Sequence, residues 1–523
     1  MPALRVLIAI VVTLLMSACA SLPDRVERVE STALTGTEGT RLGQALRPEI
    51  AAHPGKSGIY PLSDAKDAFA ARILLAQAAD RSLDLQYYIW HGDTTGQLLW
   101  QALWEAAERG VRVRLLLDDA NTGGLDPILA ALDAHPNIQI RLFNPFPNRS
   151  FRVADFAGDF SRVNRRMHNK SFTADNQVTI VGGRNVGNEY YGADVNVGFQ
   201  DLDVMGVGPV VREVSAEFDR YWNSESAYPA ASLLPASTDG AALLSDNWQK
   251  VWQDPQAQRY IEAVRQTPLA QQVAQRKIAF EWTTARVLSD DPAKVRFPPE
   301  RSDLQLVPQL LEVFGKAQRE LDLVSPYFVP GKGGSKALED MAGRGVKVRV
   351  LTNSLSATDV APVHAGYAKY RKELLQSGVA LYELKPGAAN VTAKDEDKRA
   401  PGVPGSGGSG GSSAASLHAK TFAVDRSRIF VGSFNLDPRS ARLNTEMGVL
   451  IDSPALARQL SGHFDTVIPN HAYQLRLQPD GTGMEWIDRS PSGEARYTDE
   501  PGAGALRRLW INFLSILPIE SLL

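Results

Sequence analysis

The residues best suited to chemistry in this sequence lie in a pattern that occurs twice. Each copy reads His-x-Lys-x-x-x-x-Asp and continues, after six residues, with Gly, then Gly or Ser, any residue, and Asn. The two copies supply His168, Lys170, Asp175 and Asn185, and His418, Lys420, Asp425 and Asn435. One copy could arise by chance, but two copies with identical internal spacing indicate a duplicated functional unit.

These residue types suit a phosphodiester. Lysine and asparagine donate hydrogen bonds to non-bridging phosphoryl oxygens, whose charge must be held through the transition state. One imidazole can attack phosphorus while the other protonates the departing alcohol. A metal site is the competing interpretation, but the nearby lysines repel a cation and the local carboxylates do not form a hard-metal cage. We therefore expect neither a metal nor a cofactor.

The elements around each motif explain how its side chains meet. Strand alternation places the histidine and the lysine on one face. The residues after each aspartate, Val178–Val181 and Ile429–Val431, predict a second strand, and a Gly turn then brings Asn185 or Asn435 beside the first. Two such hairpins facing each other would gather both histidines, lysines and asparagines in one pocket.

The motif aspartates, Asp175 and Asp425, need a separate interpretation. They could be catalytic carboxylates. Their position at the strand end, turned away from the histidine and lysine face, favours a structural role, such as bracing the hairpin or a lysine.

The chain before each motif has the pattern of a βαβ unit. Helices are predicted at Phe69–Ala79 and Gln97–Arg109, and strands at Ser82–Trp90 and Val111–Leu117. The segment Leu83–Arg114 has a counterpart in Leu321–Arg349. We therefore predict an α/β protein with two duplicated domains, each a mixed β-sheet flanked by helices, and an active site at the pseudo-twofold interface. The predicted division is a signal peptide (1–18), a tether (19–59), a first domain (60–285), a second domain (286–470) and an extension (471–523).

Composition limits the function classes. The 523 residues are 44% apolar and 22% charged, as in ordinary globular proteins. The chain has 56 Lys and Arg against 59 Asp and Glu, which argues against a dedicated nucleic-acid binder. A local basic run accompanies the first motif; its members are Arg149, Arg152, Arg162, Arg165 and Arg166. Such a run is usually a solvated face, but with an anionic lipid as substrate we expect it to attract the headgroup.

The two ends of the chain carry apolar segments. Arg5, the apolar run 6–15 and the small residues that follow are typical of a secretory signal, and the single cysteine, Cys19, resembles the acylated cysteine of bacterial lipoproteins. Cleavage after Ala20 is the alternative. The segment 506–523 predicts either a short helix in the membrane interface or an element docked on the core. A Gly/Ser-rich loop at 402–413 is either a flap over the pocket or an inert insertion.

The paired motifs resemble the HKD signatures of the phospholipase D superfamily, and the resemblance extends from about Ile59 to about Asn470. Three sequence segments resemble the bacterial cardiolipin synthase C group within that superfamily: 164–170 (NRRMHNK), 325–331 (SPYFVPG) and 433–440 (SFNLDPRS). Gly183 departs from the pattern, because the superfamily usually has serine there.

The resemblance implies a two-step exchange through a phosphohistidine. His168 would be the nucleophile, and His418 would protonate the leaving headgroup and then deprotonate the incoming alcohol. The phosphoryl oxygens would be held by Lys170, Lys420, Asn185 and Asn435. An acid in each half would orient the imidazole of that half: Glu446 in the second, and Asp203 in the first, with Glu189 and Asp201 as rivals.

The function that the resemblance implies is cardiolipin synthesis from phosphatidylglycerol and a second phospholipid, which could be phosphatidylethanolamine. The alternatives are hydrolysis to phosphatidic acid, a secreted nuclease, and a non-catalytic envelope lipoprotein. We expect phospholipid substrates and a membrane surface as partners, no nucleic acid, and an exported lipoprotein of the bacterial cell envelope.

Overall fold

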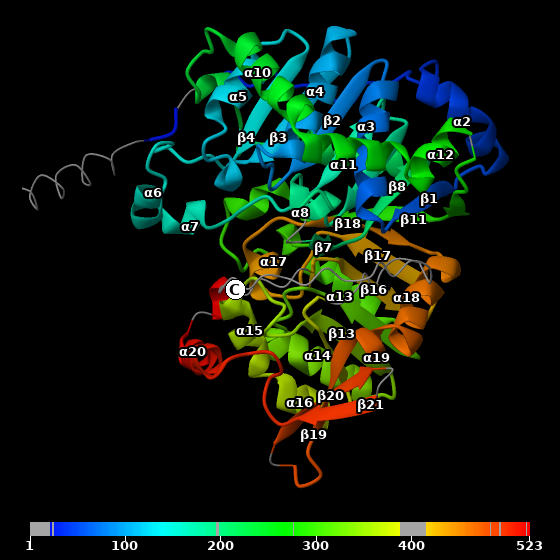
Figure 1. Cartoon of the computed structure of the whole chain (residues 1–523), viewed down its shortest axis with the longest axis vertical. Helices are drawn as coiled ribbons and strands as arrows, with labels where there is room; N and C mark the ends of the chain where they lie inside the picture. The colour runs from blue at the N-terminus through cyan, green and yellow to red at the C-terminus, as the bar shows by residue number, and fades with distance from the viewer. Residues whose placement is uncertain are drawn as a thin grey trace, which may run out of the picture.

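The computed structural model describes residues 21–23, 26–194, 198–275, 277–387, 415–481, 483–490, 493–518 and 520–523. Two halves lie against each other, each built around one large mixed sheet with helices around it (Figure 1). Cys19, the predicted signal segment and the Gly/Ser loop at 402–413 fall outside the described residues.

The first sheet has nine strands in the order β10-β1-β8-β6-β5-β2-β3-β4-β9. Its strands are β1 (Ser57–Leu62), β2 (Ser82–Tyr87), β3 (Arg112–Asp118), β4 (Ile138–Phe143), β5 (Ser171–Ala174), β6 (Val178–Gly182), β8 (Asp203–Val207), β9 (Ala227–Pro229) and β10 (Glu281–Thr283). The helices of this half are α2 (Arg41–Ala52), α3 (Ala65–Ala78), α4 (Thr94–Glu108), α5 (Asp126–Asp133), α6 (Val153–Gly158), α7 (Phe160–Val163), α8 (Asn188–Tyr191), α9 (Pro209–Trp222), α10 (Gly240–Gln253), α11 (Pro255–Arg265) and α12 (Pro268–Ala274), with the 3-10 turns η1 (Asp119–Asn121) and η2 (Ala230–Ser232).

The second sheet has ten strands in the order β11-β18-β17-β16-β12-β13-β14-β19-β20-β21. They are β11 (Ala285–Ser289), β12 (Glu320–Val324), β13 (Lys347–Asn353), β14 (Ala380–Leu384), β16 (Lys420–Val424), β17 (Arg428–Gly432), β18 (Met447–Ile451), β19 (Ala472–Leu477), β20 (Met484–Ser490) and β21 (Gly493–Tyr497). The helices are α13 (Val307–Gly315), α14 (Gly331–Gly343), α15 (Ala361–Ala368), α16 (Arg371–Gln376), α17 (Pro438–Arg442), α18 (Pro454–Thr466), α19 (Ile468–His471) and α20 (Ala505–Ile516), with η3 (Pro292–Val295), η4 (Ser302–Leu304) and η5 (Glu520–Leu522). A separate pair, β7 (Gly198–Gln200) and β15 (Ala415–Leu417), joins the halves.

The strand order confirms the predicted duplication. The run β1-β8-β6-β5-β2-β3-β4-β9 of the first sheet corresponds to β11-β18-β17-β16-β12-β13-β14-β19 of the second. In the first run β2, β3 and β4 are parallel, and in the second run β12, β13 and β14 are parallel. Every other pairing within the two runs is antiparallel. The chain passes from the first sheet to the second between β10 and β11.

Matching local interactions shape the two βαβ units. Each central pair of parallel strands carries a buried ion pair between neighbouring strands: Asp84 with Arg114, and Asp322 with Arg349, both at 2.6 Å. The helix between the strands is followed in each half by a glycine in the left-handed region, Gly110 at φ 87° and Gly345 at φ 88°. Glycine adopts this conformation without strain and ends the helix, so the next strand can begin.

An apolar layer holds the halves together. It joins side chains such as Val181 and Val211 of the first half to Val431 and Val449 of the second in one buried cluster. Because side chains of both halves pack in this one layer, the two halves are held in a fixed relative position. Residues from both halves can therefore form one site.

The two motif aspartates brace the sheets. Asp175 is fully buried and its carboxylate accepts hydrogen bonds from the backbone N–H groups of Asp80, Arg81 and Ser82, at 2.7–3.2 Å. Asp425 accepts the equivalent bonds from residues 318–320. Both lie at the turn of the hairpin with positive φ, 52° and 54°. This arrangement agrees with the bracing role favoured by the sequence pattern.

The extension after residue 470 has two parts. Its first part adds β19, β20 and β21 to the second sheet. Its second part is α20, which buries Ile511 and Leu514 in a cluster with Leu355 and Ala365 of the second half. The helix therefore docks on the core through one face. In the described part of the chain, no helix combines the length and apolar character needed to cross a membrane.

Replacing Asp175 tests its structural role. Asp175→Ala leaves three backbone N–H groups without their carboxylate, and we expect it to destabilise the protein by about 2–4 kcal/mol, seen as a lower urea midpoint. Asp425 is the matched control. Its carboxylate is less buried, so water can replace it, and Asp425→Ala should lower the midpoint less. Unchanged stability together with lost activity in Asp175→Ala would instead indicate a catalytic role.

Candidate active site

The two motif histidines lie at the boundary between the halves, and each is held by backbone from the opposite half. The His168 N–H donates to the Thr445 carbonyl at 2.8 Å, next to a parallel bridge between Met167 and Thr445. The His418 N–H donates to the Gln200 carbonyl at 2.7 Å, where β15 pairs with β7. Both imidazoles are buried, so water has little access to them.

The acids that orient the imidazoles are exchanged between the halves. His168 Nδ1 lies 2.9 Å from Glu446 Oε2, and His418 Nδ1 lies 2.5 Å from Asp201 Oδ2. The prediction that each half orients its own histidine is therefore wrong. The reason is topological: each acid follows a segment that pairs with the opposite half, so its side chain reaches across the boundary.

The choice of Asp203 as an orienting acid is also wrong. Asp203 begins β8, and its carboxylate lies 2.9 Å from Arg72 and 3.4 Å from Arg184. It is a buried counter-ion for two arginines of its own half. The other rival, Glu189, pairs with His91 at 3.2 Å.

Gly183 stands where the superfamily usually has serine, and the neighbouring Asp201 explains why. A Cβ built on Gly183 would lie 2.2 Å from Asp201 Oδ1, so any side chain there displaces the carboxylate from His418. In the other half the equivalent residue is Ser433, and its hydroxyl donates to Glu446 at 2.5 Å. Ser440 donates to the other carboxylate oxygen at 2.8 Å. Each half therefore matches the residue after the motif glycine to its acid: Gly183 leaves room for Asp201, and Ser433 holds the longer Glu446.

The motif lysines point into the same buried site. Lys170 Nζ donates to the His168 carbonyl and Lys420 Nζ to the His418 carbonyl, both at 2.5 Å. Burial lowers the pKa of Lys420 to about 8 and holds the pKa of Lys170 well below its usual value. Burial, followed by the charges of Lys170 and Lys420, also holds the pKa of His168 well below 6.5. The lowered pKa of each group shows that burial disfavours its charged form, so an anionic ligand that pairs with the lysines would stabilise their protonated state.

The two carboxylates differ in protonation. Burial raises the pKa of Glu446 to about 7. Burial also opposes ionisation of Asp201, but contact with His418 and the charges of Lys420 and Arg184 hold the Asp201 pKa below its usual range. His418 thus faces a fully ionised partner, whereas His168 faces one that titrates near neutrality.

The motif asparagines are not equivalent. Asn185 Oδ1 accepts from the Ile89 N–H at 3.2 Å and its Nδ2 donates to the Tyr190 hydroxyl at 3.0 Å. Asn435 is buried, and its Oδ1 has no hydrogen-bond partner among the described residues. Asn435 therefore has the greater freedom to reorient toward a ligand.

Aromatic side chains pack against the catalytic candidates. Tyr88 meets His168 edge-on with ring centroids 5.0 Å apart, and its ring lies 5.4 Å from Lys170 Nζ. Tyr190 and Phe199 lie 5.2 and 5.1 Å from His418. They limit the rotation of both imidazoles, and sequence analysis did not single them out, because aromatic residues are common in any core.

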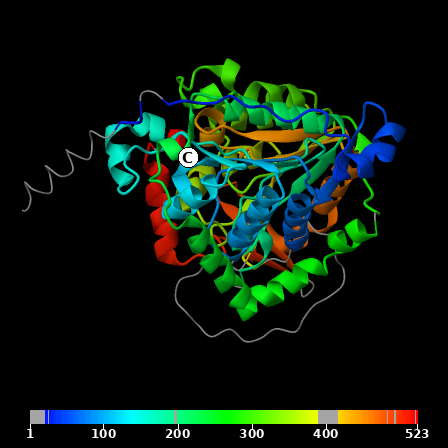
Figure 2. The ribbon, with the colours of Figure 1, turned by 90° about the horizontal axis from the view of Figure 1, so that it is seen from above.

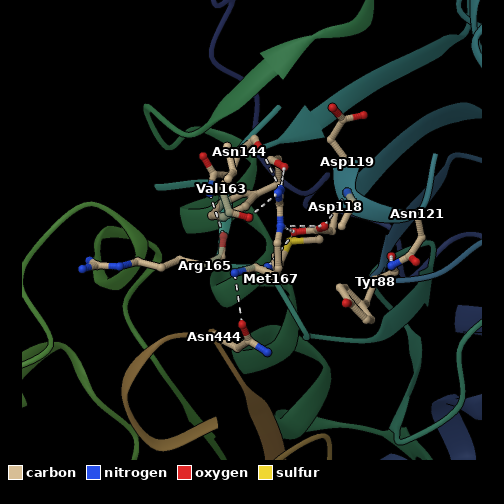
Figure 3. Close-up of polar contacts among 12 residues, drawn as sticks. Tyr88, Asp118, Asp119, Asn121, Asn144, Val163, Arg165, Met167 and Asn444 are labelled. Atoms are coloured by element: carbon tan, nitrogen blue, oxygen red, sulfur yellow. Dashed lines mark hydrogen bonds and ion pairs between the residues drawn. The ribbon is translucent and has the colours of Figure 1, made fainter. Parts of the chain in front are cut away.

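A buried network fixes the backbone before His168. Asp118, the last residue of β3, accepts from the Met167 N–H at 2.7 Å and from Arg166 Nε at 3.1 Å, while Arg166 Nη2 donates to the Asn144 carbonyl at 2.6 Å. Figure 3 shows Asp118, Met167 and Asn144 around this network, with Asn444 of the second half below it. The Arg166 N–H donates to Asn444 Oδ1 at 3.1 Å. Asp118 was missed because an aspartate at the end of a strand has no distinctive sequence signal.

This network corrects the interpretation of the basic run. Arg166 is buried, and Arg149 and Arg152 both pair with Asp119. Arg162 pairs with Asp159, which leaves Arg165 as the member of the run without an ion pair to the described residues. Most of the run therefore stabilises the loop before the first motif and does not form an open cationic surface.

The donor set suits phosphoryl chemistry. Two histidines, two lysines and two carboxylates converge, and no group of three or more His, Cys, Asp or Glu with metal-site geometry occurs among the described residues. One imidazole can attack phosphorus, the second can carry the proton of the leaving group, and the lysines can hold the equatorial oxygens.

Asp201 and Asp203 give a matched test of the site. Asp201→Asn removes the anion that orients His418, and we expect kcat to fall about 10²–10⁴-fold while the protein stays folded. Asp203→Asn removes the counter-ion of Arg72 and Arg184, so it should lower the urea midpoint and reduce kcat less than about tenfold. A larger loss of kcat in Asp203→Asn than in Asp201→Asn would contradict the geometry.

The pKa values of Glu446 and Lys420 predict a narrow bell in kcat/KM. As the pH falls through about 7, Glu446 takes up a proton and no longer accepts from His168 Nδ1, so kcat/KM falls. As the pH rises through about 8, Lys420 loses the charge that holds the phosphoryl group, so kcat/KM falls again.

Two variants assign the limbs of that profile. Glu446→Gln should lower kcat/KM and remove the acidic limb, because the amide does not titrate. Lys420→Arg keeps its charge and should shift the alkaline limb upward. Limbs that stay at their positions in both variants would show that other groups control the profile.

Known proteins match both halves. Residues 72–222 and 310–468 match the family described as "Cardiolipin synthase, PLD-like domain". The relative cardiolipin synthase C of Escherichia coli (strain K12) is 46% identical over 486 residues, which cover 92% of this chain and 100% of the relative. Cardiolipin synthase A of Pseudomonas entomophila (strain L48) is 27% identical, with 76% of this chain and 66% of the relative covered.

A solved structure supports the fold. The phosphatidylserine synthase of Haemophilus influenzae Rd KW20 superposes with a TM-score of 0.52 at 14% identity, covering 82% of this chain and 91% of that chain. The resemblance stated from the motifs is confirmed by the family match and by the Escherichia coli relative. With one family match in each half and that relative aligned along its whole length, the chain belongs to the cardiolipin synthase family of PLD-like domain proteins.

Proposed function

We propose that the protein is a phosphatidyltransferase that makes cardiolipin from phosphatidylglycerol and a second phospholipid, with phosphatidylethanolamine as the donor to test first. The observation that carries the proposal is the pair of exchanged dyads, His168 with Glu446 and His418 with Asp201, beside two buried lysines. The 46% identical relative, which is named a cardiolipin synthase, supports the choice of reaction.

In the first step, His168 Nε2 attacks the donor phosphorus. The bond between phosphorus and the headgroup oxygen breaks, and His418 transfers a proton to that oxygen, so the headgroup alcohol leaves. A phosphatidyl group remains on His168. Lys170 and Lys420 hold the non-bridging oxygens, and Asn435 has the freedom to join them.

In the second step, the terminal hydroxyl of phosphatidylglycerol replaces the headgroup. His418 takes the hydroxyl proton, the oxygen attacks phosphorus, and the bond from phosphorus to His168 breaks. Both histidines return to their starting protonation states, so the cycle needs no cofactor. The products are cardiolipin and the free headgroup alcohol.

The electrostatics support this division of roles. The pKa of His168 lies well below its usual value, so its imidazole is neutral and nucleophilic at neutral pH. Burial and Lys420 also lower the pKa of His418, but Asp201 opposes that shift. An ionised partner stabilises the imidazolium that a proton carrier must form.

The same proposal includes export to the bacterial cell envelope and acylation of Cys19. The support is the apolar run 6–15 and the Ser-Ala-Cys sequence at 17–19. Lipidation would hold the enzyme at its phospholipid substrates. The segment 506–523 is the second candidate for membrane contact.

Purified protein in vesicles of phosphatidylethanolamine and phosphatidylglycerol tests the function. We expect cardiolipin and free ethanolamine in equal amounts, and His168→Ala should reduce both by at least about 10³-fold, because the nucleophile is lost. His463→Ala, a histidine of α18 outside the site, is the matched control and should retain activity. Phosphatidic acid as the sole product would indicate hydrolysis, and plasmid degradation without lipid turnover would indicate a nuclease.

A further inference from the structure

Helix α20 exposes one apolar face after docking through the other. Ile511 and Leu514 are buried against the second half. The opposite face carries five large apolar side chains that are at least half exposed: Leu506 (83%), Leu509 (64%), Trp510 (53%), Phe513 (52%) and Ile516 (82%). Their spacing of three or four residues puts them in one stripe along the helix. A stripe of this size on a folded protein indicates a surface that contacts something apolar.

A second apolar patch lies on the first half, around α6 and α7. Four large side chains there are exposed: Phe151 (45%), Val153 (70%), Phe156 (41%) and Phe160 (45%). Helices α6, α7 and α20 lie on the same side of the molecule in both views (Figures 1 and 2). The two patches come from different halves and are separated by 340 residues or more of sequence.

The charged residues next to these patches favour an anionic surface. Arg507 is half-buried on α20 and donates to the Thr358 carbonyl, and Arg165 follows α7 and donates to the Phe297 carbonyl. Neither forms an ion pair with the described residues. Aromatic rings and long aliphatic side chains next to unpaired arginines are typical of protein surfaces that lie in the headgroup region of a bilayer.

The chain connects both patches to the active site. After α20, Glu520 of η5 accepts from the Tyr370 hydroxyl, and the Leu523 carbonyl accepts from the Arg439 N–H at 2.6 Å. Arg439 Nη1 donates to the Asn164 carbonyl at 2.9 Å. Asn164 directly follows α7 and precedes His168 by four residues.

We propose that α6–α7 and α20 form one composite docking face that binds the surface of an anionic bilayer. The face defined in this way spans both halves, so docking holds the active site at one height and orientation relative to the lipid. The proposal rests on phospholipids being the substrates, as argued above, and adds the surface through which the enzyme reaches them.

Local probes test the contact directly. In a Cys19→Ser background, Val153→Cys in α6 and Leu509→Cys in α20 each carry an environment-sensitive NBD label, and Leu311→Cys in α13 is the control. Leu311 is 51% exposed, and its helix, α13, lies away from α20 in Figure 1. Vesicles of phosphatidylglycerol and phosphatidylethanolamine should blue-shift the emission of both face labels and leave the control unchanged.

Each other outcome of the labelling overturns the proposal. A shift at Leu509 without one at Val153 would show that α20 binds alone. A shift that appears without vesicles and grows with protein concentration would show self-association. Equal shifts with purely zwitterionic phosphatidylcholine vesicles would contradict the role of anionic lipid.

Activity separates docking from chemistry. The double variants Trp510→Ser/Phe513→Ser and Val153→Ser/Phe160→Ser should lower turnover of vesicle lipid about tenfold or more. The same variants should turn over dispersed dihexanoyl phospholipids as the wild type does, since these substrates need no bilayer contact. Leu311→Ser is the matched control.

Equal losses with both substrates would show a damaged fold or site and would contradict the docking role. Failure of the proposed function would give a different result. If the wild type turned over neither substrate, the proposed phosphatidyltransferase activity would be contradicted, while the NBD labels would still report whether the face binds vesicles.

Discussion

Each half of the protein supplies the histidine of one dyad and the carboxylate of the other, and the rest of the structure depends on this exchange. Glu446 holds His168 and Asp201 holds His418 across the boundary, so neither half has a complete dyad alone. A small shift between the halves would separate both pairs at once. The apolar layer between the sheets and the backbone bonds at His168 and His418 prevent that shift.

Duplication produced two similar dyads, and small differences make them unequal. Asp201 is the shorter acid and needs the space that Gly183 leaves, whereas Glu446 is longer and is held by two serine hydroxyls. The pKa of Asp201 is held low and that of Glu446 is raised to about 7. These opposite shifts favour a neutral nucleophile at His168 and a proton carrier at His418, which is what a two-step exchange requires.

The sequence was sufficient to predict the duplicated α/β fold and the hairpin after each motif histidine, because the same spacing occurs twice. The expected strand alternation of histidine and lysine is wrong, since His168 and Lys170 precede β5 and His418 precedes β16. The sequence could not predict the partners of the motif residues. Asp201 and Asp203 are two positions apart and chemically identical, and only the pairing of β7 with β15 decides which one reaches His418. The burial of Arg166 and its bond to Asp118 depend on contacts between distant segments, which a charge pattern does not contain.

The exchange of acids is tested most directly by the 15N NMR spectrum of histidine-labelled protein. The structure predicts that Asp201→Asn changes the Nδ1 and Nε2 shifts of His418 and leaves those of His168 unchanged, while Glu446→Gln changes the shifts of His168 alone. His168→Ala and His418→Ala assign the two sets of signals. The reverse pattern, in which Glu446→Gln changes His418 and Asp201→Asn changes His168, would show that each half orients its own histidine and would contradict the structure.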